Sequence, residues 1–132
     1  MSYTQDQMRS LWIGDSLWNA AVRIYLTDTL DTNVNLTKKY HMLVSNYYMN
    51  RIAKEVGLTA LEGSINESKA RADALEYCVG EHAQKFGADS AIKHIVDLLL
   101  DHVNLKQLNQ IASERKGRKS ALFQRFWIKQ PL

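Results

Sequence analysis

The most informative stretch of the sequence reads Arg71-Ala72-Asp73-Ala74-Leu75-Glu76-Tyr77-Cys78-Val79-Gly80-Glu81. These residues predict a helix, on which Asp73 and Glu76 leave the same face with their Cβ atoms about 5–6 Å apart. Carboxylates held that close repel each other, so they are stable when they face water, a basic partner or a divalent cation. Hard cations such as Mg²⁺ take oxygen ligands of this kind. The pair therefore indicates either a solvated helix face or part of a metal site.

The length of the chain and its single cysteine limit the class of protein. With 132 residues, the chain suits one domain that buries a core without disulfides or metals. Cys78 excludes an intrachain disulfide and a zinc cluster, and its apolar surroundings in the sequence predict a buried, inert thiol. No apolar run approaches the roughly 18 residues of a membrane helix, and no secretory signal is visible. We therefore expect a soluble protein of a reducing, cytoplasmic compartment, with no membrane partner.

Positive charge gathers in the last quarter of the sequence. The net charge of the whole chain is +3, but the segment 106–129 carries a single acid against seven basic residues: Lys106, Arg115, Lys116, Arg118, Lys119, Arg125 and Lys129. A basic extension on a nearly neutral body is typical of proteins that bind a polyanion such as nucleic acid. A solvated tail without a partner is the alternative interpretation.

The distribution of apolar residues predicts an all-α fold. The single proline is Pro131, and alternating apolar and polar runs are scarce, which disfavours strands. We expect the first helix to begin at Thr4, whose hydroxyl forms a capping box with Gln7, and to end near Leu26. Gly14 in the middle of this helix costs about 1 kcal/mol relative to alanine. A glycine at this position suggests the close approach of another backbone.

Further helices follow the loop expected at 27–35. One helix is predicted at 37–56, with Gly57 as its C-cap. The helix that carries the acid pair begins with a second capping box, formed by Ser64 and Glu67.

The acid-bearing helix ends at Gly87, and Asp89 or Ser90 caps the helix that follows. A last helical stretch is expected at 105–114. These boundaries predict a compact helical domain at 1–104, followed by a basic helical extension at 105–132.

Three segments of the chain, in this order and spacing, resemble one known family. The first reads Leu11-Trp12-Ile13-Gly14-Asp15-Ser16-Leu17. The second comprises Leu36-Thr37, Leu43-Val44-Ser45-Asn46 and Ile52-Ala53-Lys54-Glu55-Val56-Gly57-Leu58, and the third reads Ala72-Asp73-Ala74-Leu75-Glu76 with Gly80. The first is similar to the signature helix of the ribonuclease III family, the second to the helix after it, and the third to the A-D-A-x-E stretch of that family. The resemblance covers residues 8–100 of the chain.

The resemblance to the ribonuclease III catalytic domain implies an all-helical endonuclease that acts as a homodimer on double-stranded RNA. It also implies that Asp15, Asp73 and Glu76 are the catalytic residues and bind Mg²⁺, for which Mn²⁺ can substitute. The signature glutamate of the family falls on Leu11, and a glutamate further upstream falls on Met8. The chain departs from the family at these two positions, which leaves the number of bound metals open.

The residues after the predicted core are too few for the double-stranded-RNA-binding domain of the family. A ribonuclease III domain alone, without the signature glutamate, is most similar to the Mini-ribonuclease III branch; an unusual single-domain ribonuclease III is equally open. RNA affinity would then depend on dimer contacts and on a basic cluster of four residues: Arg115, Lys116, Arg118 and Lys119.

The sequence supports three hypotheses of function. The first is a Mg²⁺-dependent endoribonuclease that hydrolyses phosphodiester bonds in double-stranded or structured RNA, because a carboxylate-bound cation activates water and stabilises phosphoryl charge. The second is a non-catalytic ribonuclease III-like RNA-binding or assembly protein, with Leu11 as its first lost ligand. The third is a helical nucleic-acid-binding or protein-interaction module that has only chance similarity to the family.

Overall fold

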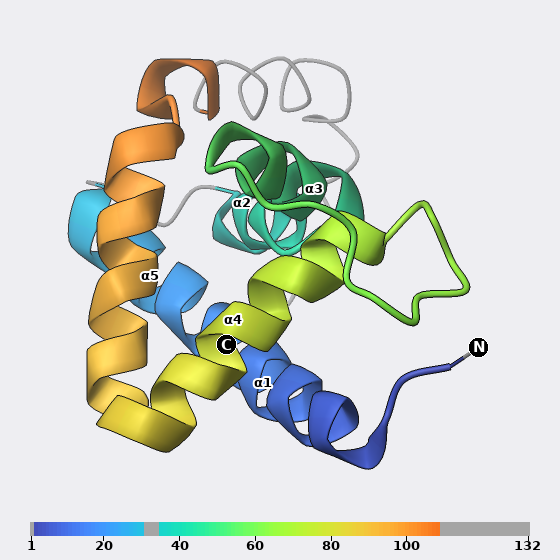
Figure 1. The fold of residues 1–132 in the computed structure, drawn as a ribbon. Helices are drawn as coiled ribbons and strands as arrows, with labels where there is room; N and C mark the ends of the chain where they lie inside the picture. Colours follow the sequence, from blue (N-terminus) through green and yellow to red (C-terminus); the bar gives the residue numbers. More distant parts are fainter. Residues whose placement is uncertain (1, 31–34, 109–132) are drawn as a thin grey trace, which may run out of the picture. The chain divides into compact units, whose positions relative to one another are not determined.

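The computed structural model describes residues 2–30 and 35–108 of the chain. All regular structure within these ranges is helical, as the sequence predicts. The helices are α1 (Gln5–Thr29), α2 (Leu36–Leu43), α3 (Asn46–Glu55), α4 (Ala70–Phe86) and α5 (Ala88–His102) (Figure 1).

The chain divides after His102. Met1–His102 form one compact unit, and the chain from Val103 onward belongs to a second unit. The second unit is described over residues 103–108, with a helical turn at 105–108. The remainder of the helical stretch predicted at 105–114 lies outside the described residues. Among the helices that the structure describes, none is long and apolar enough to cross a membrane.

The first helix begins where the sequence predicts. The Thr4 hydroxyl accepts a hydrogen bond from the backbone N–H of Gln7 (3.1 Å), and the Gln7 side chain accepts one from the N–H of Thr4 (2.9 Å). The helix ends at Thr29 rather than near Leu26. Thr27 and Thr29 lie in its last turns, where their hydroxyls donate to carbonyls one turn earlier (2.8 and 2.6 Å), so both polar groups are satisfied within the helix.

The single helix predicted at 37–56 is wrong, because two helices, α2 and α3, occupy this range. Ser45 lies between them, and its hydroxyl donates to the carbonyl of Met42 (2.7 Å) and accepts from the N–H of Tyr48 (3.2 Å). One side chain thus bonds the end of α2 and caps the start of α3. Gly57 follows α3 with a φ of 85°, the left-handed conformation that commonly follows a helix end.

The capping box predicted for the acid-bearing helix is also wrong. α4 begins at Ala70, after the positions of Ser64 and Glu67, and the Ser64 hydroxyl bonds within its own loop. The cap comes from α3 instead, because the Asn50 side-chain oxygen accepts a hydrogen bond from the N–H of Ala72 (2.7 Å). The Asn50 amide nitrogen also donates to a loop carbonyl (2.6 Å), so one side chain fixes both the loop and the start of α4.

The other end of α4 agrees with the sequence. Gly87 ends the helix with a φ of 97°. α5 begins at once at Ala88, so Asp89 and Ser90 lie inside its first turn and neither is the cap that the sequence predicts. The Ser90 hydroxyl lies 2.8 Å from Nε2 of His82 in α4, which ties the two helices together at this corner.

The core of the first unit lies where α1 packs against α4 and α5 (Figure 1). Its largest fully buried side chains come from α1, α2, α3 and α5: Trp18, Tyr25, Leu26, Leu43, Met49, Ile52, Ile95 and Leu99. Leu75 of α4 is also buried. Trp18 donates its indole N–H to the carbonyl of Leu43 (3.2 Å). The largest core side chain therefore keeps its polar group hydrogen-bonded.

Candidate functional site

α1 and α4 approach so closely that their contact requires two glycines. A Cβ atom on Gly14 of α1 would collide with the backbone carbonyl oxygen of Glu76, and one on Gly80 of α4 would collide with that of Ser10. Gln84 donates a hydrogen bond to the Ser10 hydroxyl (2.9 Å) beside the second contact. Figure 1 shows α4 crossing over α1 at this place. The close approach that the sequence predicts at Gly14 is therefore confirmed.

The crossing brings the three predicted carboxylates into one electrostatic cluster. Asp15 follows Gly14 and is exposed, Glu76 is partly buried, and Asp73 is 6% exposed. Burial, and then the charges of Asp15 and Asp73, raise the pKa of Glu76 to about 8. Lys69 opposes this rise without cancelling it. The carboxyl group of Glu76 is therefore influenced first by its burial and then by both other acids of the cluster.

Tyr3 holds the buried member of the cluster. Its hydroxyl donates a hydrogen bond to Oδ2 of Asp73 at 2.7 Å. Burial, together with this bond and the Asp73 charge, raises the pKa of Tyr3 above its usual value. Tyr3 and Asp73 are 70 positions apart in the sequence, so no helical or strand periodicity relates them. For this reason the sequence did not indicate Tyr3 as a residue of the site.

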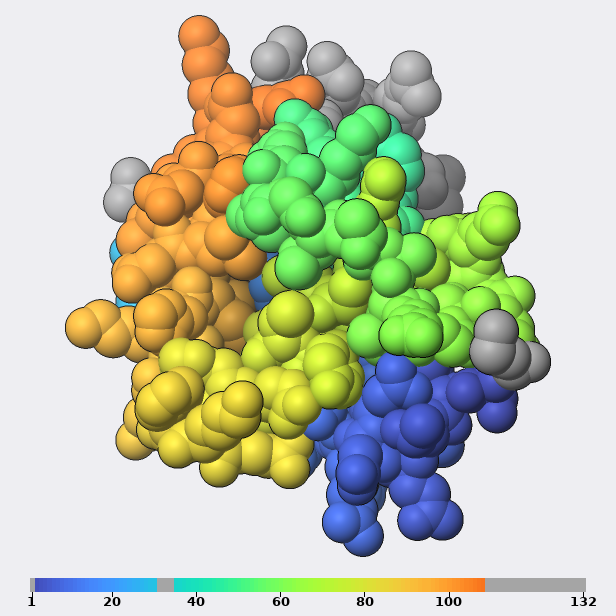
Figure 2. Space-filling model, viewed as in Figure 1, coloured from blue at the N-terminus to red at the C-terminus, as the bar shows by residue number. Residues whose placement is uncertain are grey.

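The segment before α1 reaches the cluster because it lies against the loop between α3 and α4. Gln7 donates to the carbonyl of Glu62 (2.8 Å), and the backbone of Ser2 lies beside Gly63. Figure 2 shows this loop and the first turns of α1 side by side on one face of the molecule. These contacts bring Tyr3 to the start of α4.

The donor set of the cluster fits a hard divalent cation, because carboxylate oxygens are the ligands that Mg²⁺ and Mn²⁺ prefer. Asp15, Asp73 and Glu76 would hold such an ion. In residues 2–30 and 35–108, however, no group of three or more His, Cys, Asp or Glu side chains is arranged to hold a metal. The three carboxylates interact through their charges without converging on a common point.

Cys78 is exposed, and the prediction of a buried thiol is wrong. Val79, the next residue, takes the buried position, and consecutive helical residues lie about 100° apart around the axis. Cys78 instead lines a cavity of 270 Å³ between α4 and α5. Desolvation beside this cavity, and then the charge of Glu81, raise the pKa of the thiol, which keeps it a weak nucleophile.

The basic cluster predicted to contact RNA, Arg115, Lys116, Arg118 and Lys119, lies outside the described residues. Comparisons of the chain with protein-family models, with curated proteins and with solved structures found no match.

Proposed function

We propose that this chain is a Mg²⁺-dependent endoribonuclease of the ribonuclease III type, which hydrolyses phosphodiester bonds in double-stranded or structured RNA and accepts Mn²⁺ in place of Mg²⁺. One observation carries the proposal. Asp15 and Glu76 flank a backbone contact between two helices, and Asp73 lies one turn from Glu76, so three carboxylates from α1 and α4 interact. Oxygen donors gathered in this way suit a cation that binds phosphates.

The residues of the cluster contribute differently to this chemistry. A bound cation would activate the attacking water and neutralise charge on the phosphate. The hydroxyl of Tyr3 holds Oδ2 of Asp73, which leaves Oδ1 as the oxygen of that carboxylate for a ligand. Asp15 is exposed, so it presents its carboxylate on the side from which RNA can approach. Glu76 is partly buried and lies in the middle of the helix α4, where its backbone carbonyl packs against Gly14 of α1.

A cleavage assay tests the proposal. Purified protein is incubated with double-stranded RNA in the presence of Mg²⁺, and in parallel with a chelator. We expect cleavage with Mg²⁺ alone, and a loss of more than about a hundredfold in Glu76→Gln, because a lost ligand exceeds the usual cost of a lost supporting residue. Glu67→Gln is the matched control, because Glu67 is an exposed glutamate of the preceding loop.

A non-catalytic RNA-binding or assembly protein is the second candidate, and two observations favour it. The carboxylates do not form a ready metal site within the described chain, and Asp73 already accepts a hydrogen bond from Tyr3. The same assay separates the candidates. RNA binding without cleavage, unchanged in Glu76→Gln, would contradict the enzyme and support the binding protein.

A homodimer in a reducing, cytoplasmic compartment completes the proposal. A single exposed thiol, Cys78, suits such a compartment because oxidation would cross-link it. Contacts between two subunits, and the basic cluster Arg115, Lys116, Arg118 and Lys119, would bind the RNA backbone with a strong dependence on salt. Sedimentation velocity tests the dimer, and a monomer at micromolar concentration would contradict it.

A further inference from the structure

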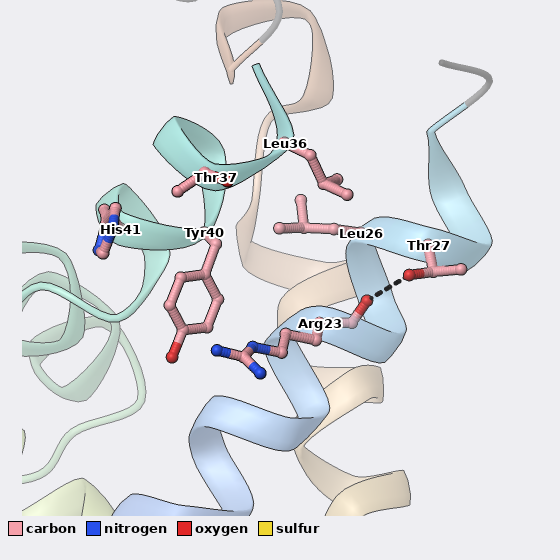
Figure 3. Close-up of a pocket in the computed structure, with 7 residues that line it drawn as sticks. All are labelled: Arg23, Leu26, Thr27, Leu36, Thr37, Tyr40 and His41. Carbon is pink, nitrogen blue, oxygen red and sulfur yellow. Dashed lines mark hydrogen bonds between the residues drawn. The ribbon is translucent and has the colours of Figure 1, made fainter. Parts of the chain in front are cut away.

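A second cavity lies away from the carboxylates, between the C-terminal half of α1 and the helix α2. Its volume is 360 Å³, within the range of about 300–1,000 Å³ that is usual for small-ligand sites. Seven residues line it: Arg23, Leu26, Thr27, Leu36, Thr37, Tyr40 and His41. Figure 3 shows the Arg23 side chain extending from α1 toward the Tyr40 ring of α2, with Leu26 and Leu36 facing each other above them.

Arg23 is the charged group of this cavity, and its guanidinium lies over the Tyr40 ring. Its central carbon lies 4.6 Å from the centroid of the Tyr40 ring. Within the described residues it forms no ion pair, and its guanidinium donates no hydrogen bond. Arg51 offers a direct contrast, because it also lies over a tyrosine, at 6.0 Å, but pairs with Glu55 at 3.3 Å.

The lining has the chemistry of a receptor for an anion attached to a flat ring. None of the seven residues is acidic. A guanidinium that stacks on an aromatic ring uses its flat face, so the N–H groups at its edge can still donate hydrogen bonds. Through these groups it can bind a phosphate with two parallel hydrogen bonds. The Thr37 hydroxyl and the exposed His41 imidazole add polar groups to the wall.

Ring and apolar surfaces are present in the same cavity. The His41 ring meets the Tyr40 ring edge-on, with centroids 5.4 Å apart, and the partly exposed Leu36 supplies apolar surface above the buried Leu26. Nucleobases stack on aromatic rings and on guanidinium planes, and each stacked base contributes about 1–3 kcal/mol to binding. A phosphate joined to a base therefore matches both parts of the lining.

We propose that this cavity binds one nucleotide unit, with the phosphate on Arg23 and the base against the Tyr40 and His41 rings. The unit is either a free nucleotide or one residue of an RNA strand. The site needs no divalent cation and none of the three carboxylates, so it stands whether or not the chain cleaves RNA.

The first test is a titration of the full-length chain in the presence of a chelator, followed through backbone amide chemical shifts. Adenosine 5′-monophosphate is the probe, and adenosine and inorganic phosphate are its two halves. We expect saturable shifts at Thr37, Tyr40 and His41, and weaker binding of either half. Shifts that centre on the α4–α5 cavity at Cys78 and His94, or no saturation with any probe, would overturn the assignment.

A pair of variants tests the role of the guanidinium. Arg23→Gln removes the charge and should weaken binding of adenosine 5′-monophosphate at least about tenfold, because a hydrogen bond to a charged group is lost. Arg51→Gln is the matched control, since it removes another exposed arginine that lies over a tyrosine. Equal affinity of the two variants would contradict the proposal.

A short RNA oligonucleotide distinguishes the two sources of the nucleotide. If the unit belongs to an RNA strand, Arg23→Gln weakens oligonucleotide binding and adenosine 5′-monophosphate competes with it. If the unit is free, the variant changes the affinity for adenosine 5′-monophosphate alone. Both results support the site, whereas an Arg23→Gln variant that binds both ligands like the parent overturns it. Loss of cleavage in Glu76→Gln bears on the carboxylates and leaves these measurements unchanged.

Discussion

The Cα atom of Gly14 lies directly against the backbone carbonyl of Glu76, with no room for a Cβ atom between them. This contact joins the fold to the candidate site, because Asp15 is the next residue of α1 and Glu76 carries the carboxylate with the raised pKa. The distance between the two helices therefore sets the distance between their carboxylates. A change that separates the helices should alter stability and the electrostatic cluster together.

Substituting either glycine of the crossing tests this connection. In Gly14→Ala and Gly80→Ala the new methyl group meets a backbone carbonyl, which cannot rotate away as a flexible side chain would. We expect each variant to lose about 1–3 kcal/mol of unfolding free energy, which is the usual cost of overpacking, despite the better helix propensity of alanine. Urea denaturation measures the loss.

Ser16→Ala is the control for this pair, because Ser16 is an exposed residue of the same helix. Its effect should stay within about 0.5 kcal/mol, as is usual for surface positions. Glycine variants that are as stable as Ser16→Ala would contradict the close packing of α1 on α4.

Local patterns predicted the parts of the fold that depend on neighbouring residues. Thr4 and Gln7 lie three positions apart and form the predicted capping box. Gly14 could be interpreted because a glycine in a helix interior has a cost that packing must offset. The carboxylate pair Asp73 and Glu76 was visible because helix geometry alone places two residues at this spacing on one face.

Contacts between distant segments could not be predicted in this way. Asn50 caps α4 across 22 positions, and the nearer Ser64 and Glu67 offered a misleading local alternative. Tyr3 reaches Asp73 only because the chain before α1 lies on the α3–α4 loop. The break between α2 and α3 was hidden because Ser45 interrupts a stretch whose apolar spacing fits one helix.

Removing the Asn50 cap should destabilise the start of α4. In Asn50→Ala the N–H of Ala72 loses its acceptor, and a lost helix cap costs about 1 kcal/mol. We expect that decrease in the unfolding free energy, with faster amide exchange at residues 70–73. Asn46→Ala is the control, since Asn46 is exposed on the same helix. Equal exchange rates in the two variants would show that Asn50 does not hold α4.

Removing the Tyr3 hydroxyl should loosen Asp73. Tyr3→Phe deletes the donor of the 2.7 Å hydrogen bond to a buried carboxyl group, and an unsatisfied buried polar group costs about 1–3 kcal/mol. Burial and the Asp73 interaction raise the pKa of Tyr3 above 10, so this contribution is present below pH 10 and is lost as the hydroxyl ionises. Denaturation at pH 7 measures the decrease, with Tyr47→Phe, at 81% exposure, as control. If Tyr3→Phe is as stable as Tyr47→Phe, the Tyr3 hydroxyl does not hold Asp73.

The raised pKa of Glu76 predicts how stability depends on pH without a divalent cation. The pKa rises from 4.5 to about 8 on folding, because of burial and the charges of Asp15 and Asp73. The folded state therefore binds more protons than the unfolded state between these values, and stability falls as the pH rises through this window. Below about pH 4.5 the contribution of protonated Glu76 is fully present, and above about pH 8 it is lost.

Glu76→Gln cannot ionise, so its stability should fall less between pH 5 and pH 8. Between pH 5 and pH 8 the parent should therefore lose a few kcal/mol more unfolding free energy than the variant does. This is on the order expected for a pKa change of this size. Asp15→Asn should reduce the parent's slope in part, because it removes one of the charges that raise the pKa. Glu67→Gln, an exposed control, should keep the slope of the parent. If the slopes of Glu76→Gln and Glu67→Gln coincide, the three carboxylates do not form the coupled cluster on which the proposed metal site depends.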